Sequence, residues 1–153
     1  MKIIEGNLLD CPEGINIIAH GCNCFHTMGA GIARQIKERY PEAYQADKET
    51  SYGLKSKLGT FSYAKSGFIK IANLYTQFNC GGQRELNYEA LYNCLVNLRD
   101  AINHGSNSNS YVLGLPFLIG CGLAGGDARI VKTMHDVIFE EAKFEVIIVK
   151  YKQ

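Results

Sequence analysis

The chain has 153 residues, of which 46% are apolar and 20% are charged, and its formal net charge is +1. This length is enough for one domain with a hydrophobic core and too short for two. The near-zero charge excludes a surface that binds nucleic acid through bulk charge, so any bound phosphate must be held by local geometry.

The cysteines are expected to be reduced thiols. Residues 1–5 show no long apolar stretch of a signal peptide, and no run is long enough to cross a bilayer. The apolar pattern also suffices for a core without disulfides. These features predict a cytoplasmic protein without membrane contacts. The six cysteines are Cys11, Cys22, Cys24, Cys80, Cys94 and Cys121.

Apolar periodicity predicts strands and helices that alternate through much of the chain. Pro41 separates the first two helices, and Ser66-Gly67 forms the turn of an antiparallel strand pair. His135 falls off the apolar stripe of the last helix and is expected to be exposed. The predicted strands cover residues 2–5, 16–20, 60–63, 68–74, 111–115 and 145–150. The predicted helices cover residues 31–40, 42–51, 87–103 and about 130–138.

This order of elements predicts an α/β fold with three layers, α/β/α, around a mixed, mostly parallel central sheet. Ligands of such folds bind beyond the carboxyl ends of the strands, where loops lead into helix N-termini. The loops after the strands are therefore the first place to look for a site.

Two glycine-rich loops, residues 20–31 and 120–127, each follow an apolar strand and precede an amphipathic helix. Glycine permits close approach of the backbone to a ligand, and free amides at a helix N-terminus favour an anion. Two such loops together would suit a diphosphate. Neither loop matches a Walker A motif or a dinucleotide-binding fingerprint, and a glycine-rich turn without a ligand is the alternative for either one alone.

The first loop also contains four residues of the types that bind zinc, His20, Cys22, Cys24 and His26. Two thiols and two imidazoles are suitable zinc ligands. Their alternating spacing is too tight for one tetrahedron, since residues two apart on a strand are poorly placed for it. We therefore expect no metal.

Five segments of the chain form a recognisable series of motifs. They are Gly6-Asn7-Leu8-Leu9, Ile18-Ala19-His20-Gly21-Cys22-Asn23, Gly29-Ala30-Gly31-Ile32-Ala33, Arg39-Tyr40-Pro41 and Ile119-Gly120-Cys121-Gly122-Leu123-Ala124-Gly125-Gly126. In order and spacing they resemble the macrodomain family over nearly the whole chain. The resemblance implies one macrodomain over residues 1–153, most similar to the branch with ADP-ribose-1″-phosphate phosphatases and glutamate-linked ADP-ribose hydrolases.

The resemblance also implies roles for individual residues. Asn7 stands where many macrodomains have an aspartate that accepts from the adenine amine, and an amide oxygen can still accept. Leu8 would offer its backbone amide beside the base, and Asn23 would contact the distal ribose. The implied ligand-binding residues are Asn7, Leu8, Gly21, Asn23, Met28, Gly29, Ala30, Gly31, Ile32, Gly120, Cys121, Gly122, Leu123, Ala124 and Gly125.

The hydrolase branch uses a lysine that attacks the distal ribose and an acidic residue just after the Gly-Cys-Gly-Leu run of the second glycine loop. Here Gln77 and Ala124 take these two positions. Glutamine cannot form the imine that a lysine amine can, which argues against the lysine-dependent hydrolysis.

His20 and Asp127 are the two catalytic candidates. His20 is expected at the end of its strand, at the mouth of the pocket, where an imidazole could protonate a leaving oxygen or orient a water. The alternative for His20 is a strand-end histidine that only bonds backbone. Asp127 could orient a water near the distal phosphate, or simply cap the last helix, and the two roles can coexist.

The resemblance implies an enzyme that binds ADP-ribose and hydrolyses the terminal phosphate of ADP-ribose-1″-phosphate, as a monomer and without a cofactor. The alternatives are a non-catalytic reader of free or protein-linked ADP-ribose and a lysine-independent hydrolase that removes ADP-ribose. Aromatic candidates for covering the adenine or ribose are Tyr75, Phe78, Phe117 and Tyr151.

Overall fold

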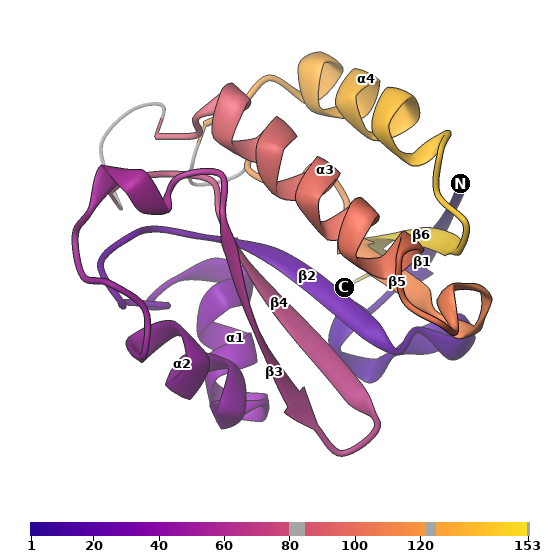
Figure 1. Cartoon of the computed structure of the whole chain (residues 1–153), viewed down its shortest axis with the longest axis horizontal. Helices are drawn as coiled ribbons and strands as arrows, with labels where there is room; N and C mark the ends of the chain where they lie inside the picture. Colours follow the sequence, from indigo (N-terminus) through magenta and orange to yellow (C-terminus); the bar gives the residue numbers. More distant parts are fainter. Residues whose placement is uncertain (80–84, 122–124, 153) are drawn as a thin grey trace.

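The computed structural model describes residues 1–79, 85–121 and 125–152 (Figure 1). Its elements follow the predicted order, with ends that differ by one to three residues at most positions. The strands are β1 (Lys2–Gly6), β2 (Ile17–Cys22), β3 (Phe61–Ser66), β4 (Ile69–Tyr75), β5 (Val112–Pro116) and β6 (Glu145–Tyr151). The helices are α1 (Gly31–Arg39), α2 (Pro41–Lys48), α3 (Tyr88–Asn103) and α4 (Ala128–Phe139).

The strands form one sheet in the order β1-β6-β5-β2-β4-β3. Strands β1, β6, β5, β2 and β4 run parallel to one another, and β3 pairs antiparallel with β4 at the edge. The predicted mixed, mostly parallel sheet is thereby confirmed. Its consequence for function is that five strands end at the same edge.

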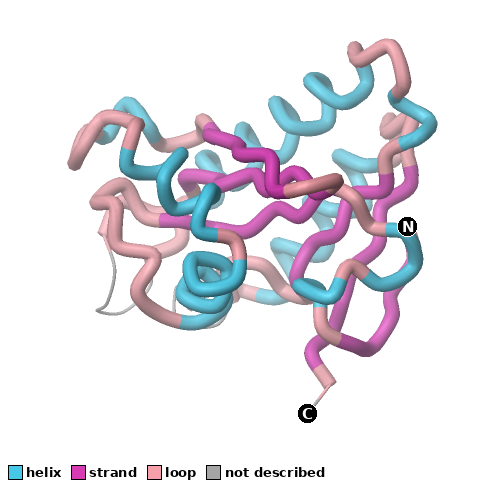
Figure 2. The backbone as a smooth tube through the Cα atoms, turned by 90° about the horizontal axis from the view of Figure 1, so that it is seen from below, coloured by secondary structure: helices cyan, strands magenta, loops and turns pink. Residues whose placement is uncertain are grey.

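Helices cover both faces of the sheet, as Figures 1 and 2 show. Alternate strand residues enter the two cores: Ile17 packs with α3 and α4, and Ile18 packs with α1 and α2. The same alternation holds in β6, where Ile147 and Ile148 enter opposite cores. Strands that are apolar on both faces are what a sheet covered on both sides requires. The predicted three-layer fold is confirmed.

Strand β2 continues two residues beyond its predicted end. Gly21 and Cys22 pair with Leu74 and Tyr75 of β4 in parallel register, so the glycine does not stop the strand. His20 consequently lies inside β2 and below the protein surface, and not at the end of the strand.

The prediction that His135 is exposed is wrong. Its side chain is 4% exposed on α4, packs against the ring of Phe139, and its Nε2 has no hydrogen-bond partner among the described residues. Burial lowers the pKa of His135 from 6.5 to about 4, because the charged ring would lose its hydration. The ring is thus neutral in the folded protein near neutral pH.

The cysteine side chains at positions 11, 22, 24, 94 and 121 are free thiols, and Cys80 lies outside the described residues. Over the described ranges, no helix combines the length and the apolar character needed to cross a membrane.

We predict that the protein loses stability as the pH falls from 6.5 towards 4, because the unfolded chain binds a proton on His135 that the folded chain does not. This histidine alone should lower the free energy of unfolding by about 2 kcal/mol between about pH 7.5 and about pH 5. In His135→Leu the pH dependence should shrink by this amount, as urea unfolding at both pH values would measure. An unchanged pH dependence would contradict the prediction, and the same change at the exposed His104 is the surface control.

Candidate functional site

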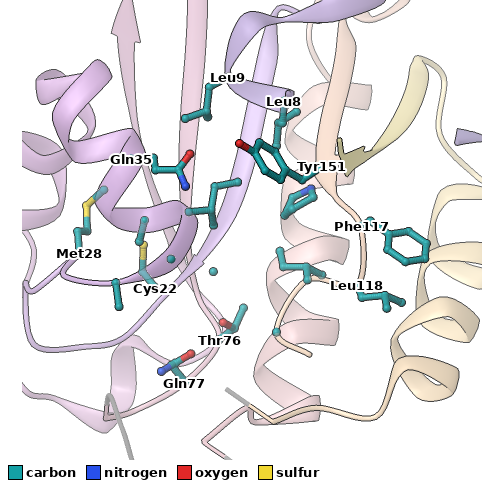
Figure 3. A pocket seen from close by; sticks show the side chains of 18 of the residues that line it. Leu8, Leu9, Cys22, Met28, Gln35, Thr76, Gln77, Phe117, Leu118 and Tyr151 are labelled. Carbon is teal, nitrogen blue, oxygen red and sulfur yellow. The ribbon is translucent and has the colours of Figure 1, made fainter. Parts of the chain in front are cut away.

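A cavity of about 1000 Å³ opens at the edge where the parallel strands end. It is lined by the segments that follow β1, β2, β4 and β5 and by the end of β6. Figure 3 shows α1 on one side of it and the segment after β5 on the other. This is the position that the fold class predicts for a ligand.

The first glycine loop is held in shape by the side chain of Asn23. Its Oδ1 accepts from the amide of Phe25 at 2.8 Å, and its Nδ2 donates to Thr27 Oγ1 at 2.6 Å. Asn23, Thr27 and the residues that follow line the cavity. The side chain of Asn23 therefore stabilises the wall of the cavity through hydrogen bonds within the loop.

The loop ends at the N-terminus of α1, which lies at the cavity. Ala30 occupies the N-cap position in an extended conformation, and no side chain among the described residues caps the helix there. Gly31, Ile32 and Ala33, the first residues of α1, line the cavity. The first amides of a helix lack partners within the helix and carry partial positive charge, so this end of the cavity suits an anion.

The second glycine loop reaches the cavity through Gly120. Its carbonyl accepts from the amide of Gly126 at 2.9 Å, which closes the loop on itself. Of the remaining predicted residues of this loop, Cys121 and Gly125 do not line the cavity, since Cys121 turns back with its amide on the carbonyl of Leu118 at 2.9 Å. The predicted contacts at Gly122, Leu123 and Ala124 lie outside the described residues.

The N-terminus of α4 differs from that of α1, because Asp127 caps it. One carboxylate oxygen accepts from the amide of Arg129 at 2.9 Å, and the guanidinium of Arg129 pairs with the other oxygen at 2.9 Å. These bonds lower the pKa of Asp127 to about 2. The capping role is confirmed, whereas the predicted approach of Asp127 to the ligand finds no support, because the residue does not line the cavity.

The other end of the cavity is apolar. Leu8, Phe117 and Tyr151 lie around it in Figure 3. Asn7 also lines it, but its Oδ1 already accepts from the amide of Leu9 at 3.0 Å and caps a short 3-10 helix. Two of the four aromatic candidates, Phe117 and Tyr151, thus lie at the cavity.

The other two aromatic candidates lie elsewhere. Tyr75 is buried, and Phe78 packs on Phe25 with ring centroids 4.9 Å apart. Gln77 does line the cavity, at the end opposite Leu8 and Tyr151 (Figure 3).

The predicted position of His20 at the mouth of the pocket is wrong. The side chain is 0% exposed and does not line the cavity, because β2 continues past it and carries it into the core of α1 and α2. Its Nε2 bonds Asn73 Oδ1 at 2.7 Å, and burial lowers the pKa of His20 to about 4. A direct catalytic contact of His20 with a ligand is not supported by this placement.

The structure brings most of the predicted ligand-binding residues to one cavity. Their binding of a ligand remains a prediction. Asp47 and Thr76 also line it and were missed. Thr76 directly follows β4, so the strand-end rule could have found it, whereas nothing in the sequence distinguishes Asp47 from a surface residue of α2. The predicted residues at the cavity are Asn7, Leu8, Gly21, Asn23, Met28, Gly29, Ala30, Gly31, Ile32 and Gly120.

Metal ligation has no geometric support in residues 1–79, 85–121 and 125–152. No three His, Cys, Asp or Glu side chains of these ranges are grouped as a metal ion would need.

Comparison with known proteins gives relatives over the whole chain and over a part of it. No protein-family model matches. An uncharacterized 17.5 kDa protein from the tk-vs intergenic region of Enterobacteria phage T4 is 36% identical over 160 residues, which cover 99% of this chain and 97% of that protein. An ADP-ribose 1''-phosphate phosphatase of Aspergillus oryzae is 48% identical over 44 residues, which span 29% of this chain and only 21% of that protein.

Solved structures share the fold over nearly the whole chain. The macrodomain of Mycobacterium tuberculosis DarG has a TM-score of 0.74 at 21% identity, covering 97% of this chain and 95% of that chain. A Trypanosoma brucei macrodomain in complex with ADP-ribose has a TM-score of 0.69 at 14% identity, covering 99% of this chain and 63% of that chain. With its strand order and its cavity at the strand ends, the chain has the macrodomain fold. Within this class it belongs to the same family as the 17.5 kDa phage T4 protein.

We predict that Gly120→Ala destabilises the protein more than Gly67→Ala does. Both glycines have positive φ, +79° and +61°, so both changes strain the backbone. A Cβ at position 120 would also lie 2.8 Å from Leu86 Cδ1, whereas one at position 67 would meet nothing within 4 Å. The extra cost should be about 1–3 kcal/mol in the free energy of unfolding, and equal losses would show that Leu86 gives way freely.

Proposed function

We propose that this macrodomain binds ADP-ribose in the cavity at the strand ends. The observation that carries the proposal is the uncapped N-terminus of α1 opening on a cavity of about 1000 Å³. Such a helix end holds a phosphate group without a basic side chain, and the volume suits a ligand with several groups. The binding of ADP-ribose by a macrodomain of the same fold supports the choice of ligand.

The two ends of the cavity suit the two ends of this ligand. The apolar end at Leu8, Phe117 and Tyr151 offers flat and aliphatic surface to an adenine ring. The start of α1 also lines the cavity and would take the diphosphate. The distal ribose would then lie at the opposite end of the cavity, beside Thr76 and Gln77 (Figure 3).

We further propose that the protein removes the terminal phosphate of ADP-ribose-1″-phosphate. The regional identity with an ADP-ribose 1''-phosphate phosphatase supports this activity. Gln77 at the distal end has an amide where a lysine-dependent hydrolase needs an amine, so imine chemistry is disfavoured. Because the product ADP-ribose would still fit the cavity, turnover should be slow and inhibited by product.

A non-catalytic reader of ADP-ribose is the second candidate. The burial of His20 favours it, since this side chain cannot touch a reacting phosphate from inside the core. The reader and the phosphatase share the same cavity and differ only in turnover.

Calorimetric titration with ADP-ribose, with AMP as the control, tests the binding. We expect ADP-ribose to bind much more tightly than AMP, and the absence of ADP-ribose binding would overturn the proposal. Incubation with ADP-ribose-1″-phosphate and measurement of released phosphate then separates the phosphatase from the reader.

We predict that Ala30→Asp weakens ADP-ribose binding by about tenfold or more. Ala30 directly precedes α1 and lines the cavity, so the carboxylate would repel the diphosphate at the N-terminus of the helix. Ala30→Ser adds a polar group without charge and should retain most of the affinity. Calorimetric titration measures both variants, and equal losses in both would count against the anion site.

A further inference from the structure

Two buried polar atoms at the cavity have no hydrogen-bond partner in the described part of the chain. They are Asp47 Oδ2 and Thr76 Oγ1. Both residues are only 1% exposed, and both line the cavity. Each atom exposes less than 1 Å² to the cavity, so a ligand can pair with it only after the side chain turns slightly, and the cost of leaving a buried polar atom unpaired favours that turn.

The space above the hydroxyl of Thr76 depends on Gly21. A Cβ at position 21 would lie 2.8 Å from Thr76 Oγ1, so any other residue there would cover the hydroxyl. The backbone amide and carbonyl of Thr76 are both paired, with Cys22 and Asn87, and only the side chain is left over. The one unpaired polar group of Thr76 is thus its hydroxyl, which lies on the side of the residue that faces Gly21 and the cavity.

The other oxygen of Asp47 is the end of a hydrogen-bond chain that begins at His20. The orientation of the amide of Asn73 is fixed, because its Nδ2 lies 2.9 Å from the carbonyl oxygen of Ala43, which can only accept. Asn73 Oδ1 must then accept from His20 Nε2, at 2.7 Å. The neutral His20 ring therefore carries its proton on Nε2.

The remaining hydrogen bonds of this chain are also donated in the direction of Asp47. Asn73 Nδ2 donates to Ser62 Oγ at 3.1 Å, and Tyr75 donates to Asp47 Oδ1 at 2.8 Å. The hydrogen of Tyr75 is used in that bond, so the 2.8 Å contact between Ser62 and Tyr75 must be donated by Ser62. Every bond from His20 to Asp47 thus donates towards the carboxylate, an arrangement in which successive bonds strengthen one another.

We propose that Asp47 is the acidic group with which the cavity accepts a hydroxyl hydrogen of its ligand, and that His20 is a positioning residue acting on Asp47 through Asn73, Ser62 and Tyr75. This inference rests on the proposed binding of ADP-ribose. A carboxylate attracts O–H donors and repels phosphate, so Asp47 recognises a sugar hydroxyl and not a phosphate oxygen. The ligand's distal ribose is the group with hydroxyls to offer at the end marked by Thr76.

Calorimetry with ADP-ribose and with ADP, which lacks the distal ribose, tests the role of Asp47. Asp47→Asn keeps the shape of the side chain and an oxygen for Tyr75, and it removes the charge. We expect the affinity for ADP-ribose to fall about ten- to hundredfold and the affinity for ADP to change little. Equal losses for both ligands, or no loss for either, would overturn the assignment. If the wild-type protein binds no ADP-ribose, the proposed function fails and this inference fails with it.

The role of His20 is tested by its coupling to Asp47. His20→Leu removes the donor to Asn73, and His20→Gln keeps an N–H in a similar place. We expect His20→Leu to weaken ADP-ribose binding severalfold, His20→Gln to restore most of it, and His20→Leu to have no further effect in the Asp47→Asn background. Additive losses would show that His20 supports the fold without acting through Asp47.

Thr76→Val gives a test that does not depend on a charged group. It replaces the unpaired hydroxyl by a methyl of similar size, so the melting temperature should rise while the affinity for ADP-ribose falls severalfold. Thr60→Val is the matched control: its hydroxyl donates to the carbonyl of Lys57 at 2.7 Å, away from the cavity. The control should lower the melting temperature and leave the affinity unchanged. A Thr76→Val protein that binds ADP-ribose as well as the wild type would overturn the ligand contact at this end of the cavity.

Discussion

The parallel pairing of β2 with β4 on one side and β5 on the other determines where both glycine loops and the segment after β4 lie. Because these strands run in the same direction, the segments that follow them open on one edge of the sheet. The same register sets His20 opposite Asn73 in adjacent strands, which makes the first bond of the buried chain possible. A slip of one residue would move every β2 side chain to the other face and would abolish both the loop positions and the chain.

The two glycine loops are similar in sequence and different in electrostatics. The helix after the first loop, α1, presents uncapped amides to the cavity, whereas in the helix after the second, α4, Asp127 accepts from the amide of Arg129. Arg129 in turn pairs with that carboxylate. The fold therefore concentrates its attraction for an anion at one helix and uses the other for structure. The nearly neutral chain needs no excess of basic residues to hold a phosphate.

The sequence was most informative where its apolar period was regular. The continuous apolar run of β6 and the helical stripe of α3 gave nearly correct boundaries, because the first reflects burial on both faces of the strand and the second burial on one face of the helix. The glycine loops and their motif order also located most of the residues that line the cavity. These features are local, so they can be recognised without knowing which segments meet in space.

What could not be predicted depends on tertiary contacts. His20 was placed at a strand end because Gly21 follows it, but pairing with β4 carries β2 through the glycine and buries the histidine. His135 looked exposed by its helical position, and packing against Phe139 buries it. Asp47 becomes recognisable only when Tyr75 is seen to occupy one of its oxygens and the cavity lies beside it.

The directional chain from His20 to Asp47 constrains how this sequence can vary among descendants. Each interior member both accepts and donates, so replacing one of them by an apolar residue leaves two neighbours unpaired in the core. Exchanging all of them for a packed apolar set would cost little in the core but would leave Asp47 without its anchor. We therefore expect the residues at positions 20, 62, 73 and 75 to be conserved together among related sequences. A relative that lacks one of them should also lack the others and Asp47.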